Sequence, residues 1–138
     1  MDLVLDTNIL FSFFRENPVR KIIIEARQLG LRLYAPAYAL EELRKNRDDL
    51  LRYTNLKSHG GIDIIIKTLE TCIDIKPMDF FEEYREKAQL ITPDQKDAPF
   101  FALALKLKAD LWSNEPRLKR QSIVNVMTTR EIRKLVDI

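Results

Sequence analysis

Four acidic residues lie where carboxylates could do chemistry together. They are Asp6 in "LVLDTNILFSFF", Glu42 in "ALEEL", Asp97 in "DQKDAPFFALAL" and Glu115 in "LWSNEPRL". Carboxylates in one cluster repel one another and raise one another's pKa, and a divalent cation removes that objection. Oxygen-only ligands suit hard ions such as Mg²⁺ or Mn²⁺, which activate water and stabilise charge on a phosphoryl oxygen. The set therefore agrees with metal-dependent hydrolysis of a phosphate ester.

Three of these positions also have ordinary structural interpretations. Asp6 follows an apolar run and can cap the helix predicted after it. Glu115 precedes a proline and can lie at a helix start. Glu42 and its neighbour Glu41 can each be a solvated helix residue. Both fall away from the leucine stripe of their predicted helix, so helical periodicity leaves the choice between them open.

The segment before "PFFALAL" resembles a helix start. Thr92 is predicted as its N-cap, with Pro93 at the first helical position and Gln95 closing a capping box. Asp94 is then a first-turn acid that the helix dipole favours, and its capping role is explanation enough. Asp97 lies a turn further on without a basic partner at helical spacing, so its structural interpretation is weaker than that of Asp94.

The residue counts weaken or exclude several other classes of site. The one histidine, His59, lies in "SHGG", where a surface role is expected, and the one cysteine, Cys72, lies in an apolar context typical of a small buried residue. One cysteine excludes an internal disulfide and fits a reducing cytoplasm. No signal peptide, glycine-rich phosphate loop or apolar run of about 20 residues is evident. The net charge of +2 permits a nucleic-acid partner without requiring one.

Short apolar runs alternate with helical patterns along the whole chain. This alternation predicts a single α/β domain over residues 1–138, with a central, mostly parallel sheet of about five strands covered on both faces. The predicted strands are 3–5, 31–36, 73–77, 110–113 and 125–128, and the predicted helices are one from about Asn8, then 18–30, 36–54, 61–72, 79–90, 92–109 and 129–137. Ligands of such sheets bind outside the carboxyl ends of the strands, where Asp6 would lie.

The segments "LVLDTNIL", "APAYALEEL", "DQKDAPFFALAL" and "LWSNEPRL" are similar, in order and approximate spacing, to a PIN domain. This is the nuclease fold used by VapC-type toxins of toxin–antitoxin pairs. The resemblance implies a three-layer α/β/α fold, an acidic pocket that binds Mg²⁺ or Mn²⁺, and endonucleolytic cleavage of RNA. It also implies a VapB-like antitoxin that inserts a segment into that pocket, and a homodimer. With no membrane segment evident, a cytoplasmic protein is expected.

Position by position, the resemblance implies a role for each acid. Asp6 and Asp97 would hold the principal ion, and Glu42 would help bind it or orient the attacking water, with Glu41 as its open alternative. Glu115 stands where the family usually has aspartate, and it would support a second ion or its water shell. Two polar residues, Asn8 and Ser113, resemble the family's supporting residues. Asp94 is a possible extra acid, although its capping role is reason enough for it.

Two basic clusters are available for RNA phosphates. The better placed follows Glu115 and contains Arg117, Lys119 and Arg120. The other contains Arg44, Lys45 and Arg47, and solvated helix faces are the ordinary explanation of both.

Two alternatives to a toxin remain open: a solitary PIN nuclease, and a non-catalytic PIN domain that binds RNA or a protein. The departure at Glu115 keeps the non-catalytic alternative open. A phosphotransfer domain of the haloacid-dehalogenase type is disfavoured, because Asn8 stands where its second aspartate is required.

Overall fold

The computed structural model describes residues 1–138 and contains one five-stranded sheet. Its strands are β1 (Asp2–Leu5), β2 (Arg32–Pro36), β3 (Asp74–Lys76), β4 (Asp110–Trp112) and β5 (Val126–Met127). They lie in the order β3-β2-β1-β4-β5, and every neighbouring pair is parallel. The α/β class and the parallel sheet of about five strands are therefore confirmed.

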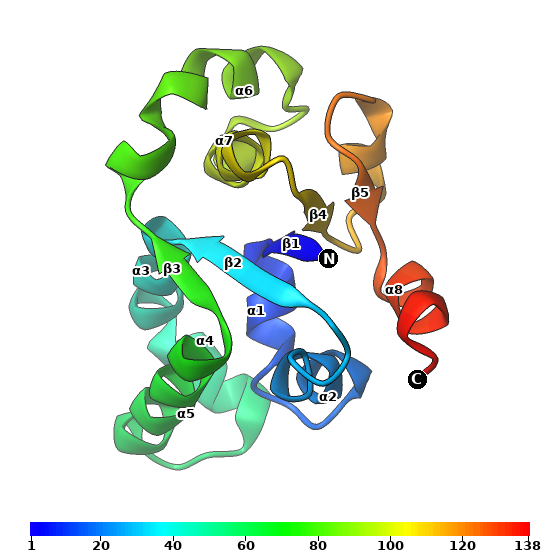
Figure 1. The fold of residues 1–138 in the computed structure, drawn as a ribbon. Coiled ribbons are helices and arrows are strands. Elements are labelled where there is room, and N and C mark those ends of the chain that lie inside the picture. The colour runs from blue at the N-terminus through cyan, green and yellow to red at the C-terminus, as the bar shows by residue number, and fades with distance from the viewer.

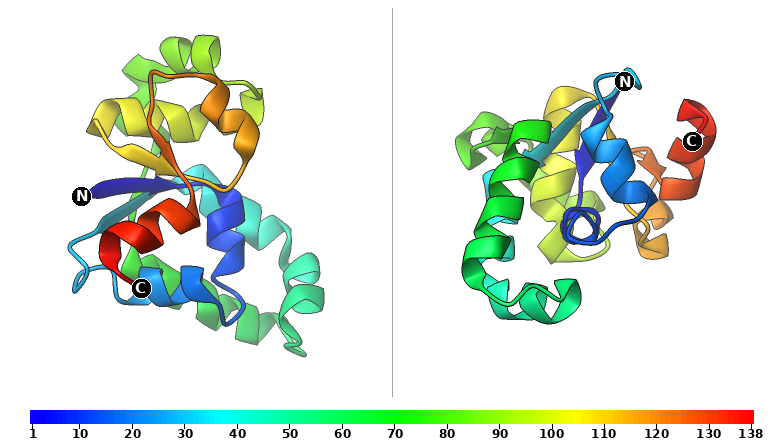
Figure 2. Two further views of the ribbon diagram at one scale, coloured as in Figure 1. Left: turned by 90° about the vertical axis from the view of Figure 1, so that its right-hand side faces the viewer. Right: turned by 90° about the horizontal axis from the view of Figure 1, so that it is seen from below.

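Helices cover both faces of this sheet, which gives the three layers visible in Figure 1 and Figure 2. The α-helices are α1 (Thr7–Ser12), α2 (Pro18–Ile24), α3 (Ala37–Lys45), α4 (Arg47–Thr54), α5 (His59–Cys72), α6 (Arg85–Ile91), α7 (Ala98–Leu107) and α8 (Thr129–Val136). Three 3₁₀ helices complete the set: η1 (Met78–Tyr84), η2 (Gln95–Asp97) and η3 (Pro116–Arg120). In both figures α6 and α7 lie on one side of the sheet and α1 and α2 on the other. None of these helices combines the length and the apolar character needed to span a membrane.

The core is built around β1, the central strand. Leu3, Val4 and Leu5 are completely buried, as expected for a parallel strand covered on both faces. Helix α7 packs across β1, β2 and β4, and its residues Phe100 and Phe101 are also buried. This packing fixes the start of α7 near the end of β1.

The prediction of one long helix over 36–54 is wrong, because the helix is interrupted at Asn46. That residue has φ −100° and ψ 27°, and it separates α3 from α4. The Asn46 side chain donates to the carbonyl of Glu42 at 2.8 Å. Asparagine side chains offer the backbone such local alternatives to helical hydrogen bonding, which explains the break.

The capping box predicted at Thr92 is also wrong. Thr92 is buried at the end of α6, where its hydroxyl donates to the carbonyl of Ala88. Asp94 is the residue that caps, by accepting from the Lys96 amide at 3.1 Å, and it opens the short helix η2. Helix α7 then begins at Ala98, six residues after the predicted start.

Two other predicted helices differ in extent. The helix expected over 18–30 ends at Ile24, and the one expected over 79–90 is the 3₁₀ helix η1 followed by α6. Cys72, expected to be buried, is partly exposed at the end of α5. His59 is exposed and pairs with Asp48 at 2.7 Å, in agreement with its expected surface role.

Candidate functional site

The sheet has its topological switch point between β1 and β4. The chain runs from β1 to β2 on one side and later returns as β4 on the other side. In sheets of this kind, ligands bind beyond the carboxyl ends of the two strands that flank the switch. Asp6 comes directly after β1, and the segment Ser113–Glu115 comes directly after β4.

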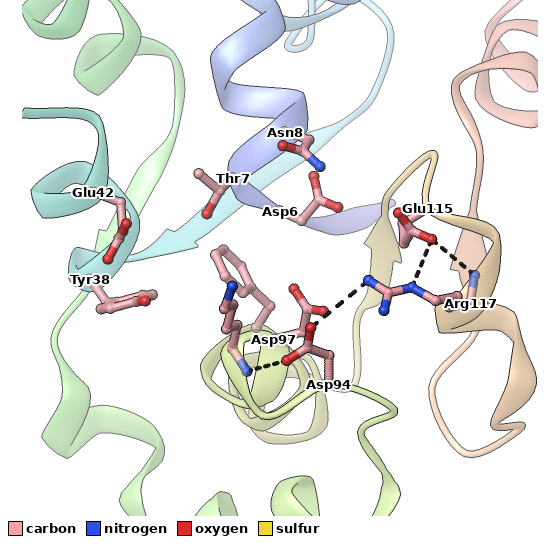
Figure 3. A pocket seen from close by; sticks show the side chains of 11 residues that line it. Asp6, Thr7, Asn8, Tyr38, Glu42, Asp94, Asp97, Glu115 and Arg117 are labelled. Atoms are coloured by element: carbon pink, nitrogen blue, oxygen red, sulfur yellow. Dashed lines mark hydrogen bonds and ion pairs between the residues drawn. The ribbon is translucent and has the colours of Figure 1, made fainter. Parts of the chain in front are cut away.

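A pocket of about 320 Å³ lies at this place. Its lining consists of Asp6, Thr7, Asn8, Tyr38, Glu42, Asp94, Lys96, Asp97, Phe100, Glu115 and Arg117, and most of these side chains are labelled in Figure 3. All four predicted acids are therefore brought to one pocket, although they come from four segments far apart in the chain. Glu41 is exposed and does not line the pocket, so only Glu42 of the pair is placed to act there.

Asp6 is almost completely buried, with 4% of its surface exposed. Its Oδ1 accepts from the Ile9 amide at 2.9 Å, so the capping interpretation of the sequence is correct as well. Burial raises the pKa of Asp6, and hydrogen bonds from Ser113 and from the Ile9 amide oppose that rise. Asp6 thus contributes to the fold and to the pocket at once.

Asp97 has no comparable structural role. It precedes α7 as the N-cap residue, but its side chain makes no capping hydrogen bond. Burial, followed by the nearby charges of Asp6 and Asp94, raises its pKa to about 6. A carboxylate held without a hydrogen-bond partner among like charges is typical of a functional site.

Glu115 is held by the turn that follows β4. Its backbone amide donates to the hydroxyl of Ser113 at 3.1 Å, and Ser113 is completely buried. Glu115 also caps η3, because its Oε1 accepts from the Arg117 amide at 3.4 Å. Ser113 does not line the pocket, and it acts through its hydrogen bonds to neighbouring groups.

Residues that were not predicted for the site also line the pocket. Tyr38 lies one helical turn before Glu42, a spacing that places both on one face of α3 and was available as a signal. The pKa of Tyr38 is raised by burial and by the Glu42 carboxylate beside it. Asp94, named from the sequence only as a possible extra acid, caps η2 and lines the pocket as well. Nothing in the sequence pattern pointed to Lys96.

The predicted phosphate-binding residues differ in their surroundings. Arg117 reaches into the pocket, whereas Lys119 pairs with Glu131 on α8 and Arg120 is exposed without an ion pair. In the other basic cluster, Arg44 pairs with Glu70 at 2.6 Å and Arg47 with Asp63 at 2.9 Å. The cluster on η3 is therefore the one next to the acids.

The donor chemistry of the pocket fits a hard divalent cation. Five carboxylates line it, and it contains neither histidine nor cysteine. The side chains do not form a closed ligand set, because no three or more His, Cys, Asp or Glu side chains are gathered closely enough to hold a metal ion. A cation here would draw on acids that lie around the pocket rather than at one point.

The protein-family model described as PIN domain matches residues 4–136 of this chain. The chain belongs to the PIN-domain family. Members of this family are generally nucleases, and the three-layer fold predicted from the resemblance is confirmed.

Several solved structures superpose on almost the whole chain. A VapBC2 structure from Rickettsia felis, bound to a DNA fragment from its promoter, has a TM-score of 0.67 at 14% identity and covers 93% of this chain and 98% of that one. VapBC-1 from nontypeable Haemophilus influenzae has a TM-score of 0.64 at 19% identity, with coverages of 94% and 99%. FitAcB from Neisseria gonorrhoeae has a TM-score of 0.63 at 15% identity, with coverages of 93% and 98%. At these identities the likeness concerns the fold, and comparison with the curated proteins gives no match.

Proposed function

We propose that this PIN domain, acting as one unit over residues 1–138, is an endoribonuclease that depends on Mg²⁺ or Mn²⁺. The observation that carries the proposal is the pocket at the β1–β4 switch point, which five carboxylates line and where the pKa of Asp97 is raised to about 6. Structural ion pairs do not explain such a cluster, because Asp97 has no hydrogen-bonded partner that would repay its burial. Family membership supplies the reaction class, hydrolysis of a phosphodiester bond.

The residues would divide the work as follows. Asp6 and Asp97 would hold the ion, Glu42 would help bind it or orient the attacking water from α3, and Glu115 would support a second ion or its water shell. Bound Mg²⁺ or Mn²⁺ supplies a water of lowered pKa and stabilises charge on the phosphoryl oxygens. Asn8 supports the acids from the pocket wall, and Ser113 does so through its hydrogen bonds. The cations of η3, which are Arg117, Lys119 and Arg120, hold phosphates next to the reacting bond.

The experiment is cleavage of single-stranded RNA by the purified protein with Mn²⁺ or with EDTA. We expect cleavage with Mn²⁺ only, and loss of cleavage in Asp6→Asn and in Asp97→Asn. Glu41→Gln is the matched control, because Glu41 is a neighbouring surface acid outside the pocket. Cleavage that survives chelation, or that survives both substitutions, would contradict the proposal.

A toxin role is the biological setting that we propose for this activity. The superposing chains from Rickettsia felis, Haemophilus influenzae and Neisseria gonorrhoeae come from VapBC and FitAB structures. By analogy we propose a VapB-like antitoxin, a homodimer and a cytoplasmic location for this chain. Growth arrest on expression that Asp6→Asn abolishes would support the toxin role, and growth without arrest would favour a solitary nuclease. Light scattering of the purified chain tests the dimer.

One observation favours a second candidate, a non-catalytic PIN domain that binds RNA or a protein. Glu115, which replaces the family's usual aspartate, pairs with Arg117 at 3.1 Å, and no three acids are gathered closely enough to hold an ion. Calorimetric titration with Mn²⁺ separates the two candidates. Binding that depends on Asp97 supports the nuclease, and the absence of carboxylate-dependent binding supports the non-catalytic domain.

A further inference from the structure

One basic side chain lies inside the acidic pocket and pairs with two of its carboxylates. Arg117 Nε lies 3.1 Å from Glu115 Oε1, and Arg117 Nη2 lies 3.9 Å from Asp94 Oδ2. The Arg117 amide also donates to the same Glu115 oxygen. Figure 3 shows the side chain reaching from η3 toward Asp94 and Asp97. The guanidinium is thus the counter-ion of one side of the pocket.

The electrostatics of the pocket agree with this geometry. The Glu115 carboxylate, with smaller contributions from Asp94 and Asp97, raises the pKa of Arg117. In return, the Arg117 charge lowers the pKa of Asp97, against the larger effects of burial and of neighbouring acids. A guanidinium keeps its charge at every physiological pH, so the pocket contains a fixed cation of its own.

Glu115 and Asp94 line the same pocket as Asp6 and Asp97, the two acids proposed to hold the ion. The guanidinium and a metal ion repel each other as like charges. The Arg117 charge beside Glu115 and Asp94 also offsets part of the negative charge that would attract a cation into the pocket. The Arg117 side chain is 50% exposed, and ion pairs of that exposure are weak enough to be displaced. A displaced guanidinium at the rim can pair with a phosphate in a bidentate manner.

Resting on the proposed function, we propose that Arg117 competes with the divalent cation for the negative charge of Glu115 and Asp94. Binding of the cation releases the guanidinium, which then holds a phosphate of the RNA. Arg117 is therefore a positioning residue with two alternative partners. Metal and substrate binding are coupled through it, since the cation makes the phosphate-binding group available.

A matched control is available in the same pocket. Lys96 also lines the pocket, but its ammonium makes no ion pair with any of the acids. Lys96→Gln therefore removes one positive charge from the pocket without removing a competitor for the carboxylates. Any excess effect of Arg117→Gln over Lys96→Gln measures the contacts of the guanidinium rather than the general potential.

The test is calorimetric titration of Mn²⁺ into the full chain, without RNA, for the wild type and for Arg117→Gln, Lys96→Gln and Asp6→Asn. We expect Arg117→Gln to bind Mn²⁺ about twofold to fivefold more tightly than the wild type, the equivalent of one partly exposed ion pair. We expect a smaller change in Lys96→Gln and loss of binding in Asp6→Asn. With saturating Mn²⁺, the KM for single-stranded RNA should rise more in Arg117→Gln than in Lys96→Gln.

The outcomes distinguish this inference from the proposed function. In one outcome Mn²⁺ binding depends on Asp6, but Arg117→Gln binds Mn²⁺ no more tightly than the wild type or than Lys96→Gln. That outcome overturns the role of Arg117 and leaves the proposed function standing. Failure of both the wild type and Arg117→Gln to bind Mn²⁺ overturns the proposed function and this inference together. Binding by Arg117→Gln where the wild type shows none supports both. Circular dichroism of each variant verifies that the fold is retained.

Discussion

Two carboxylates at helix starts, Asp97 before α7 and Glu131 in α8, have opposite electrostatic surroundings. Glu131 accepts from the Thr128 amide at 3.1 Å, completes a capping box and pairs with Lys119. These contacts lower its pKa to about 2. Asp97 makes no capping hydrogen bond, lies among other acids and has its pKa raised to about 6.

The difference separates a carboxylate that stabilises the fold from one that costs stability. Glu131 is more favourable as an anion in the folded chain than in the unfolded chain, because its hydrogen bonds and Lys119 favour the charged form. Asp97 is less favourable as an anion when folded, so the chain retains at this position a residue that folding alone would not favour. Carboxylates whose pKa is raised in this way concentrate at functional sites.

The largest effect on activity is expected at Glu42, which differs in its surroundings from Glu41, its neighbour on α3. Glu42 lines the pocket and Glu41 is exposed to solvent. Glu42→Gln should reduce the rate of RNA cleavage by about 10²-fold or more, the size expected for loss of a group that handles the attacking water. Glu41→Gln should leave the rate unchanged in the same gel-based assay. Equal losses in the two variants would mean that position in the pocket is not what matters.

Asp97→Asn should increase stability while it removes activity. The raised pKa means that the folded wild type loses stability as the pH rises from the ordinary value of 3.8 through about 6, because the folded chain keeps a proton that the unfolded chain releases. The variant does not titrate there, so it should exceed the wild type by about 1–2 kcal/mol at about pH 7.5, after allowance for partial exposure. Near pH 4 the gap should shrink. Urea unfolding at both pH values measures it, and a variant less stable at about pH 7.5 would contradict this account.

Asp6 combines the two kinds of carboxylate, and two substitutions separate its roles. Asn keeps an oxygen that can accept from the Ile9 amide, whereas Ala removes the cap of α1. Asp6→Ala should therefore be less stable than Asp6→Asn by about 1 kcal/mol in thermal or urea unfolding. Both variants should be inactive. Equal stabilities would show that the capping bond contributes nothing.

The smallest effect is expected at Glu131. Glutamine can still complete a capping box, so Glu131→Gln loses mainly the pair with Lys119, about 0.5 kcal/mol for exposed groups. Because the folded pKa is lowered from 4.5 to about 2, the wild-type advantage should be complete above 4.5 and disappear as the pH falls toward 2. Acid titration of stability measures this, with RNA cleavage unchanged. A wild-type advantage over Glu131→Gln that grows on acidification would contradict the assignment.

Local patterns in the chain were enough to predict most of the fold. The run Leu3–Leu5 has the continuous apolar character of a buried parallel strand, and the short apolar pair Leu111 and Trp112 marks a second one; both segments are strands. The helix boundaries were predicted wrongly in two places, where a side chain forms a hydrogen bond with the nearby backbone. Asn46 ended α3, and Thr92 closed α6 instead of opening α7. Such residues favour several local conformations nearly equally, so the surrounding packing makes the choice.

The residues of the pocket were likewise predicted only in part. Asp6, Glu42, Asp97 and Glu115 were predicted as one set, and they line one pocket. Their catalytic roles stay predictions. Tyr38 and Lys96 were missed. The spacing of Tyr38 from Glu42 was a usable signal, whereas nothing in the sequence marks Lys96 as a residue that enters the pocket.

The sequence by itself determined most of the elements, the end of the sheet that carries the acids and the family. Apolar periodicity sets the strands and helices, and in a parallel sheet every carboxyl end meets the same edge. Only the tertiary structure decided that Glu42 rather than Glu41 faces the pocket, and that Arg117 pairs with Glu115 and Asp94. These outcomes depend on strand order, on where each helix begins and on side-chain direction. All three are set by packing between segments far apart in the chain.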